Sequence, residues 1–466
     1  MIFTQGQFLA FFAAAFAAYW LIGNNTARKV ALLLASNVFY GAWDWRFLGL
    51  IWFTVIVDYC IGRAIQGASS ERTRKCFLIG SVVSNLSILG YFKYFDFFVS
   101  SFVRFSDTIG LPMSPHTASI ILPVGISFYT FQSLSYTIDV YRRSIPAQRS
   151  LLDFSLFVMF FPQLVAGPIV RASHFLPQLA RVRRIGDVAF GASCALFLVG
   201  FFKKRAVADN VAPTVDAFFL APEAYGTADA AGAITLYAIQ IYCDFSGYSD
   251  MAIACAALLG YQFKPNFNHP YLARSIIEFW RCWHISLSTW LRDYLYVPLG
   301  GSRLGQTRTY VNLLATMLLG GLWHGAAWTF VIWGAAHGTA LAANKAVRSA
   351  LGKPLPPLVS MAVGLPLTFA WVCLAWVFFR APTLDVALAA FASLTKLTPP
   401  TLMPWWGYVG IIAGCGIAHV FSRRFPPDSV AVRVPRPVFA ALLGLATAVT
   451  LAAVRIDYRP FIYFQF

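Results

Sequence analysis

The stretch from residue 309 to 344 carries no Asp, Glu, Lys or Arg in 36 consecutive positions. A transmembrane helix needs about 20 predominantly apolar residues, so this run is long enough to cross a bilayer. His324 lies inside it, and ionisable groups at membrane depth are costly and usually functional. If the run is one continuous path, His324 lies in mid-membrane. If Gly320-Gly321 breaks the run into a hairpin, His324 lies near the far end. Either way it is remote from the charged borders.

Apolar segments of crossing or near-crossing length recur along the whole chain. Hydrophobic residues make up 58% of the 466 positions and charged residues only 12%, whereas an ordinary soluble domain is about 25% charged. We therefore predict an all-α polytopic integral membrane protein with about a dozen crossings. No internal repeat or low-complexity tail is visible, so residues 1–466 are predicted to form one integral domain.

The positive charge follows the short loops between apolar segments. The net charge is +17, from 36 Lys and Arg against 19 acidic residues. Cytoplasmic loops of membrane proteins carry an excess of Lys and Arg. Four basic clusters fall on the cytoplasmic side if the N-terminus is extracytoplasmic, and only Lys203-Lys204-Arg205 falls outside. We therefore expect a multi-pass membrane protein with an extracytoplasmic N-terminus and with lipids as partners. Nucleic-acid binding is not expected, because the charge is spread over many short loops.

Three apolar stretches contain irregular or polar features. Segment 151–170 is broken by prolines and a glycine and is predicted to be a re-entrant or partial helix, which membrane depth tolerates only inside protein. In residues 244–250, Gly247 suggests an irregular helix, and the carboxylates of Asp244 and Asp250 suggest a hydrogen-bond network or a proton path. Asp244 is also a candidate substrate-binding residue. A similar polar stripe ends at Gln132, which is predicted to line a cavity.

The segment from about 264 to 308 is rich in Arg and Trp and too polar to span. Treated as one helix, residues 278–294 are amphipathic, with an aromatic face and a polar face. One interpretation is an interfacial anchor with a solvated basic face. The other is a donor site whose arginines bind phosphates while a histidine reaches towards the membrane. The polar face consists of Arg281, His284, Ser288 and Arg292.

The segment from about 309 to 344 is the predicted catalytic segment. A neutral imidazole at His324 is suited to take the proton from an acceptor hydroxyl that attacks a thioester carbonyl. Glycines on either side would let a substrate approach the backbone, and Trp323 and Trp328 would form walls. The alternative is a buried histidine with a structural hydrogen bond. His337, 13 residues further on, is expected to pack rather than to act with His324.

Several other kinds of site find no support in the sequence. The eight cysteines are scattered without a Cys-x-x-Cys pair, and no His-Glu-x-x-His motif occurs, so no metal is expected. A serine-hydrolase elbow, a P-loop and a dinucleotide-binding glycine motif are also missing from the sequence.

Several long motifs together resemble the membrane-bound O-acyltransferase family, and in particular its bacterial branch of the alginate O-acetyltransferase type. The resemblance covers nearly the whole chain and implies a ring of tilted helices, with re-entrant and interfacial helices, around a central tunnel. It also implies that His324 is the catalytic histidine and that His284 is the second histidine, near a cytosolic funnel. The motifs that carry it are residues 123–132, 161–168, 244–250, 278–301, 322–330, 333–338 and 460–466.

The resemblance implies transfer of an acetyl or other acyl group across the membrane to a hydroxyl acceptor. The donor would be a cytosolic thioester, either acetyl-CoA or a pantetheine-linked acyl group. The product would be an O-acetylated exopolysaccharide, such as alginate, or cell wall. A periplasmic or membrane-anchored esterase-like protein and polysaccharide-pathway proteins would be partners. Two alternatives remain open: D-alanyl or other acyl transfer to an envelope polymer, and a transporter or flippase for lipid-linked sugars. A transporter is expected to show an inverted repeat, and none is visible.

Overall fold

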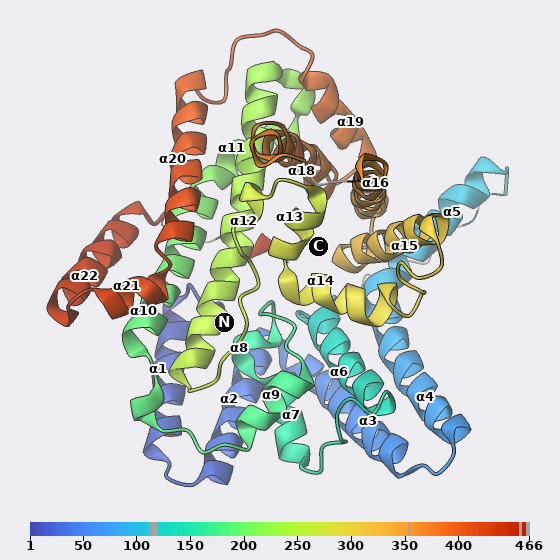
Figure 1. The fold of residues 1–466 in the computed structure, drawn as a ribbon, viewed down its shortest axis with the longest axis vertical. Helices are drawn as coiled ribbons and strands as arrows, with labels where there is room; N and C mark the ends of the chain where they lie inside the picture. Colours follow the sequence, from blue (N-terminus) through green and yellow to red (C-terminus); the bar gives the residue numbers. More distant parts are fainter. Residues whose placement is uncertain (112, 114–119, 353–354, 456–458, 463–466) are drawn as a thin grey trace. The chain divides into compact units, whose positions relative to one another are not determined.

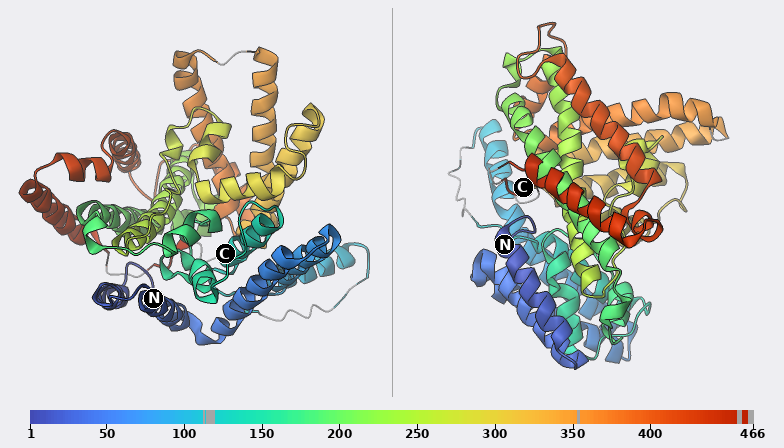
Figure 2. Two further views of the ribbon diagram at one scale, coloured as in Figure 1. Left: turned by 60° about the horizontal axis from the view of Figure 1, so that its bottom comes forward. Right: turned by 90° about the vertical axis from the view of Figure 1, so that its left-hand side faces the viewer.

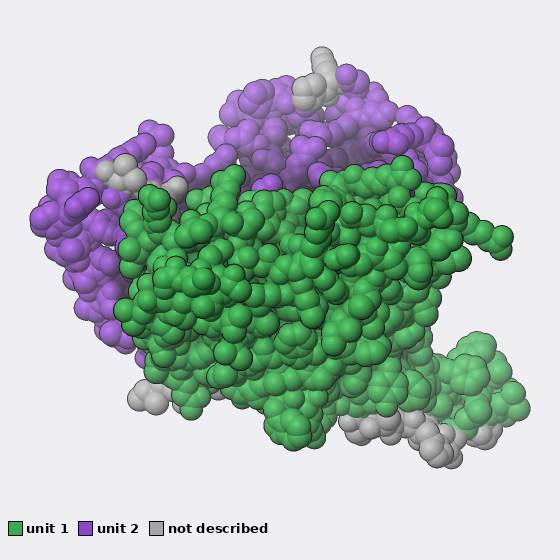
Figure 3. Space-filling model, turned by 90° about the horizontal axis from the view of Figure 1, so that it is seen from below, with its two compact units in different colours: residues 1–189, 255–263 green, residues 190–254, 264–466 purple. Residues whose placement is uncertain are grey.

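The computed structural model describes residues 1–111, 113, 120–352, 355–455 and 459–462, and every regular element in them is helical (Figure 1). This confirms the prediction of an all-α protein. The chain divides into two compact units (Figure 3). The first holds residues 1–189 and 255–263, and the second holds residues 190–254 and 264–466. Whether they act as one integral domain stays a prediction.

Five helical stretches are long and apolar enough to cross a membrane. Two shorter apolar helices add to them, at Gly6–Leu21 and Leu384–Ser393. The protein is therefore a multi-pass membrane protein, although five stretches are fewer than the dozen crossings that we predicted. The five are Asn25–Gly67, Glu71–Thr108, Pro357–Arg380, Trp405–Arg424 and Arg436–Ala453.

The first unit contains helices α1 to α9, and a buried carboxylate joins three of them, α3, α4 and α6. Asp58 is fully buried and accepts hydrogen bonds from Ser81 Oγ at 2.7 Å, from Asn85 Nδ2 at 2.8 Å and from Ser133 Oγ. A buried charge is tolerated when donors surround it in this way. The helices are α1 (Gly6–Leu21), α2 (Asn25–Asp44), α3 (Leu48–Gly67), α4 (Glu71–Leu89), α5 (Phe95–Thr108), α6 (Ile126–Tyr141), α7 (Leu151–Met159), α8 (Phe161–Leu164) and α9 (Ala172–Leu179).

Segment 151–170 forms two short helices, α7 and α8, separated at Phe160. Pro162 lies in the first turn of α8, where a missing N–H costs no helical hydrogen bond. Residues 154–170 are buried throughout. The predicted broken and buried partial helix is therefore confirmed.

The second unit contains the remaining helices, apart from the last residues of α12. Helix α20 lies alongside the green helices α10 to α12 in both figures (Figures 1 and 2). The helices are α10 (Phe190–Phe201), α11 (Asp209–Leu220), α12 (Thr227–Leu258), α13 (Ile276–Cys282), α14 (Ile285–Leu291), α15 (Gln306–His324), α16 (Trp328–Leu351), α17 (Pro357–Val359), α18 (Leu365–Arg380), α19 (Leu384–Ser393), α20 (Trp405–Arg424), α21 (Pro427–Arg433) and α22 (Arg436–Ala453).

Helix α12 is continuous through Gly247, so the expected irregularity at this residue was wrong. A Cβ atom at Gly247 would come within 2.6 Å of the Gly200 carbonyl oxygen in α10. The glycine is therefore needed for the close crossing of two helices and does not break its own. Small residues commonly allow this kind of contact between membrane helices.

The charge-free run folds as a hairpin of α15 and α16. A Cβ atom at Gly321 would lie 2.2 Å from the Phe330 carbonyl oxygen, and one at Gly334 would lie 2.3 Å from that of Met317. These glycines let the two backbones touch. Helix α15 ends at His324 and α16 begins at Trp328, so the hairpin alternative is correct. The turn comes after His324 and not at Gly320-Gly321, as that alternative had assumed.

Candidate functional site

His324 is the last residue of α15 and is 4% exposed. Aromatic rings from three helices enclose it, with centroids 5.0 Å away at Trp323, 5.0 Å at Trp333 of α16 and 5.3 Å at Phe379 of α18. A neutral imidazole in this aromatic enclosure would be suited to accept a proton.

His284 lies between α13 and α14 and is fully buried. Its backbone is left-handed, with φ of 41°, and its Nδ1 accepts a hydrogen bond from Leu287 N at 3.4 Å. This contact assigns the proton of the neutral ring to Nε2. The ring centroids of His284 and His324 are 6.5 Å apart, and Trp323 lies 6.1 Å from the first and 5.0 Å from the second. The structure thus brings together both predicted catalytic histidines.

The amphipathic helix predicted over residues 278–294 is in fact two short helices. Ser275 Oγ caps the first by accepting from Glu278 N at 3.2 Å, and the ring of His284 caps the second. The prediction of one helix was wrong because each capping side chain satisfies backbone N–H groups that a continuous helix would leave to its own carbonyls. The break turns His284 into the interior, where a single helix would have placed it with the polar face.

A cavity of about 680 Å³ lies beside these two short helices. It is lined by all three predicted donor-site residues, Arg281, Ser288 and Arg292, and also by Lys345 and Arg348 of α16. The Asp293 carboxylate, which accepts from Arg292 Nε at 2.7 Å, raises the pKa of that guanidinium above its ordinary value. Four cationic side chains, of which Arg292 is paired with Asp293, line the cavity together with hydroxyl and apolar side chains. This lining suits a phosphate-bearing ligand with an apolar arm.

Sequence reasoning missed Lys345 and Arg348 as cavity residues. Lys345 directly follows the charge-free run of residues 309–344. The pair is spaced three residues apart on α16, so both side chains lie on one helix face. That spacing was a usable signal, but nothing in the sequence said that this face meets the segment around Arg281.

Two tryptophans separate the cavity from His324. Trp280 lines the cavity, and its ring centroid is 5.7 Å from that of Trp333, which in turn contacts His324. Trp280 Nε1 donates to His337 Nδ1 at 3.3 Å, and His337 is fully buried. This agrees with the predicted packing or polar-network role of His337.

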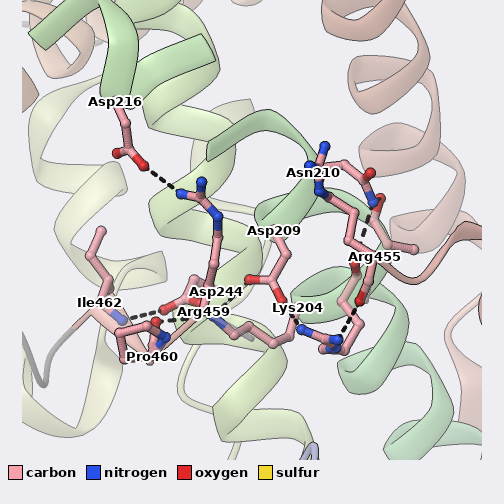
Figure 4. Close-up of polar contacts among 11 residues, drawn as sticks. Lys204, Asp209, Asn210, Asp216, Asp244, Arg455, Arg459, Pro460 and Ile462 are labelled. Carbon is pink, nitrogen blue, oxygen red and sulfur yellow. Dashed lines mark hydrogen bonds and ion pairs between the residues drawn. The ribbon is translucent and has the colours of Figure 1, made fainter. Parts of the chain in front are cut away.

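Asp244 belongs to a buried ion-pair network (Figure 4). Its carboxylate pairs with Lys204 Nζ and accepts from Ile462 N at 2.8 Å, and Lys204 also lies 2.9 Å from Asp209. Arg205 pairs with Asp209 at 2.7 Å. The geometry gives Asp244 the network role that the sequence left open, and its predicted contact with substrate stays a prediction.

The same network explains why the basic cluster at residues 203–205 violated the charge rule. All three side chains pair with carboxylates of the second unit, the third pair being Lys203 with Asp250 at 2.7 Å. Their charge is satisfied inside the protein, so it does not report on which side of the membrane the loop lies.

The glycines around His324 do not open a path for substrate. A Cβ atom at Gly325 would meet the Phe330 ring at 2.0 Å, and Gly321 meets the Phe330 backbone. The expectation of close substrate approach at these two positions was wrong, because protein atoms already fill the space.

The structure also describes two further predicted residues, Trp328 and Gln132. Trp328 begins α16 and is 56% exposed. Gln132 belongs to α6 in the first unit, is buried, and donates through Nε2 to the Phe157 carbonyl. Their roles at the site stay predictions. Within the residues that the structure describes, no group of three or more His, Cys, Asp or Glu could hold a metal ion.

Comparison with known proteins provides independent evidence about the family of this chain. Residues 128–382 match the membrane-bound O-acyltransferase family. The chain is 46% identical to a probable alginate O-acetylase AlgI of Azotobacter vinelandii and 40% identical to that of Pseudomonas putida, with 100% of each chain covered in both cases. It is 35% identical to a peptidoglycan O-acetyltransferase of Helicobacter pylori, over 86% of this chain and 81% of the relative.

Proposed function

The chain belongs to the membrane-bound O-acyltransferase family, and from this premise we propose that it moves acetyl groups across the bacterial inner membrane for O-acetylation of an exopolysaccharide. Alginate is the first candidate polymer, and cell-wall glycan is the second. One observation carries the proposal: two buried histidine rings lie 6.5 Å apart, and Trp280 and Trp333 connect one of them to a cavity lined by four cationic side chains.

The cavity is the proposed donor site. Arg281, Arg292, Lys345 and Arg348 would bind the phosphates of acetyl-CoA or of a pantetheine-linked acyl group. Charge-assisted bonds to phosphate are roughly twice as strong as neutral ones, and arginine adds a bidentate geometry. The apolar walls near Trp280 would receive the pantetheine arm and direct its thioester towards His324.

His324 is the proposed general base. It would take the proton of the acceptor hydroxyl while the hydroxyl oxygen attacks the thioester carbonyl carbon. Collapse of the tetrahedral intermediate then breaks the carbon–sulfur bond, and the leaving thiolate receives the proton. His284 Nε2–H would donate to the oxyanion. General-base help contributes roughly 10²–10⁴ in rate, and an oxyanion donor roughly 10²–10³.

The proposal requires access from both faces of the membrane. We infer a ring of tilted helices around a central tunnel, with an extracytoplasmic N-terminus and the donor cavity on the cytosolic side. The first acceptor would be a periplasmic or membrane-anchored esterase-like protein of the polysaccharide pathway. Basic loops at residues 63–75 and 171–184 support this orientation by the positive-inside rule.

Thiol release from acetyl-CoA by the purified protein in detergent tests the proposal. Wild type should release free thiol when an acceptor hydroxyl is supplied, and His324→Ala should lose it. His174→Ala is the matched control, because His174 belongs to the other unit and its ring Nε2 lies 2.9 Å from the Gln262 carbonyl oxygen. Equal thiol release by His324→Ala and wild type would refute the role of His324.

Two alternatives make different predictions in the same assay. D-alanyl transfer would need a D-alanyl thioester and leave acetyl-CoA intact, and the full-length identity to alginate O-acetylases favours acetyl. A flippase for lipid-linked sugars would release no thiol and would keep its flux in His324→Ala.

A further inference from the structure

A second cavity of about 480 Å³ lies in the same unit, between α20 and helices α10, α12 and α18. We call it the α20 groove. Its walls are mostly aliphatic and aromatic. The residues that set its character include Phe202, Ile239, Phe369, Ile412, Cys415 and Gly416.

The α20 groove is placed to receive something from the bilayer. Helices α18 and α20 both fall in stretches apolar enough to cross a membrane, and only 6% of the apolar window of α20 is buried. On α20 the lining extends from Ile412 to Ser422, which is about 15 Å at 1.5 Å per residue. The hydrocarbon core of a bilayer is about 30 Å thick, so this length matches one leaflet.

One end of the α20 groove is polar. His419 lines it, and His419 Nε2 is buried without a hydrogen-bond partner among the described residues. Ser422 lines the same end and lies 3.0 Å from His269 Nε2. Arg423 and Arg424 follow directly and are exposed. An apolar trough with a buried imidazole nitrogen and two exposed cations at one end has the polarity of a phospholipid.

Lys203 also lines the α20 groove but does not add free charge. Its Nζ lies 2.7 Å from Asp250 and 5.4 Å from the Tyr242 ring centroid. The ion pair leaves the two arginines as the cations that face an incoming headgroup.

We propose that the α20 groove binds one acyl chain of an anionic phospholipid, whose phosphate meets Arg423 and Arg424 and whose ester carbonyl accepts from His419. The proposal does not rest on the acyl-transfer function, because the aromatic layer of Trp283 and Trp376 lies between Tyr271 of the α20 groove and the rings around His324. Basic residues near a membrane surface attract anionic lipids by about 1 kcal/mol each, or about fivefold in affinity.

A pair of glycine substitutions tests the acyl-chain site. Gly416 lines the α20 groove and Gly414 does not, and a Cβ atom at either would meet nothing within 4 Å. Gly416→Phe therefore has room to fill the α20 groove, while Gly414→Phe is the matched control on the same helix. Native mass spectrometry should detect retained phospholipid on wild type and Gly414→Phe, and its loss from Gly416→Phe. Ala418→Phe, also on the lining, serves if Gly416→Phe does not fold.

Equal lipid retention by Gly416→Phe, or by Ala418→Phe, and wild type would overturn the site. The headgroup is tested by exchange with phosphatidylglycerol and phosphatidylcholine in mixed micelles. Wild type should prefer phosphatidylglycerol, and Arg423→Gln/Arg424→Gln should reduce that preference by more than about tenfold. An unchanged preference in the double variant would overturn the headgroup assignment.

Discussion

His284 has two ring nitrogens in different roles. Nδ1 caps α14 by accepting from Leu287 N, and Nε2 is buried in a ring whose centroid lies 6.5 Å from that of His324. The His284 side chain therefore caps the N-terminus of α14 through Nδ1, and its Nε2–H is the proposed hydrogen-bond donor at the reaction centre. The backbone at this residue is left-handed, with φ of 41°, a region that is uncommon outside glycine and in which histidine is among the enriched residue types.

Substitution of His284 should separate these two roles. Asn is a good N-cap and tolerates the left-handed region, so His284→Asn should keep the thermal unfolding midpoint close to that of wild type. It lacks Nε2, so thiol release should fall by roughly 10²–10³. Near wild-type activity in a folded His284→Asn protein would show that His284 is only structural.

The donor-site arginines should affect binding more than turnover. Arg281→Gln/Arg292→Gln removes two charge-assisted contacts, each worth roughly 1.5–3 kcal/mol. The KM for acetyl-CoA should rise by at least about tenfold while kcat stays within a few-fold. Arg303→Gln is the control, because Arg303 is exposed and does not line the cavity. An unchanged KM in the double variant would show that Arg281 and Arg292 do not bind the donor, and it would favour the membrane-anchor interpretation of this segment.

Among individual residues, the sequence pointed to His324 and His284 as catalytic candidates, because they lie in two long motifs. The motif around His284 also contains Arg281, Ser288 and Arg292, which line the cavity. The sequence could not predict Lys345 and Arg348, because their place depends on how α16 packs against the segment around Arg281. It also suggested substrate approach at Gly325, where the Phe330 ring already fills the space.

The α15–α16 hairpin is the element that positions His324. Its glycines let the two backbones come into contact, so the turn after His324 is fixed by helix packing. Periodicity showed that this region is helical and apolar but could not place the turn. The sequence also predicted one continuous helix through His284 and an irregular helix at Gly247. Both predictions failed because helix caps and close helix crossings depend on residues far away in the sequence.

Adding one methyl group to the hairpin should be costly. Gly321→Ala places a Cβ atom 2.2 Å from a backbone carbonyl that cannot move independently, and overpacking costs about 1–3 kcal/mol. The thermal midpoint in detergent should fall, and activity should fall with it. Gly410→Ala on α20 meets nothing within 4 Å and should be neutral or stabilising. A Gly321→Ala midpoint equal to that of Gly410→Ala would contradict the close packing of the hairpin.

For the whole molecule, composition predicted an all-α membrane protein, and the structure bears this out. It could not predict the ion-pair network that joins Asp244 to Lys204 and to Ile462, more than 200 residues further along the chain. Buried charges are stable only when paired, so this network ties the C-terminal segment of the described chain to α12 and to the segment after α10.

Inside-out membrane vesicles from cells that express the protein test the central claim most directly. Acetyl-CoA with a labelled acetyl group is supplied to the exposed cytoplasmic face, and base-labile acetyl label is measured on polymers inside the vesicle. Wild type should accumulate label while the coenzyme stays outside, and His324→Gln should accumulate none. Equal accumulation in His324→Gln, or entry of the coenzyme together with its acetyl group, would contradict a transfer across the membrane at His324.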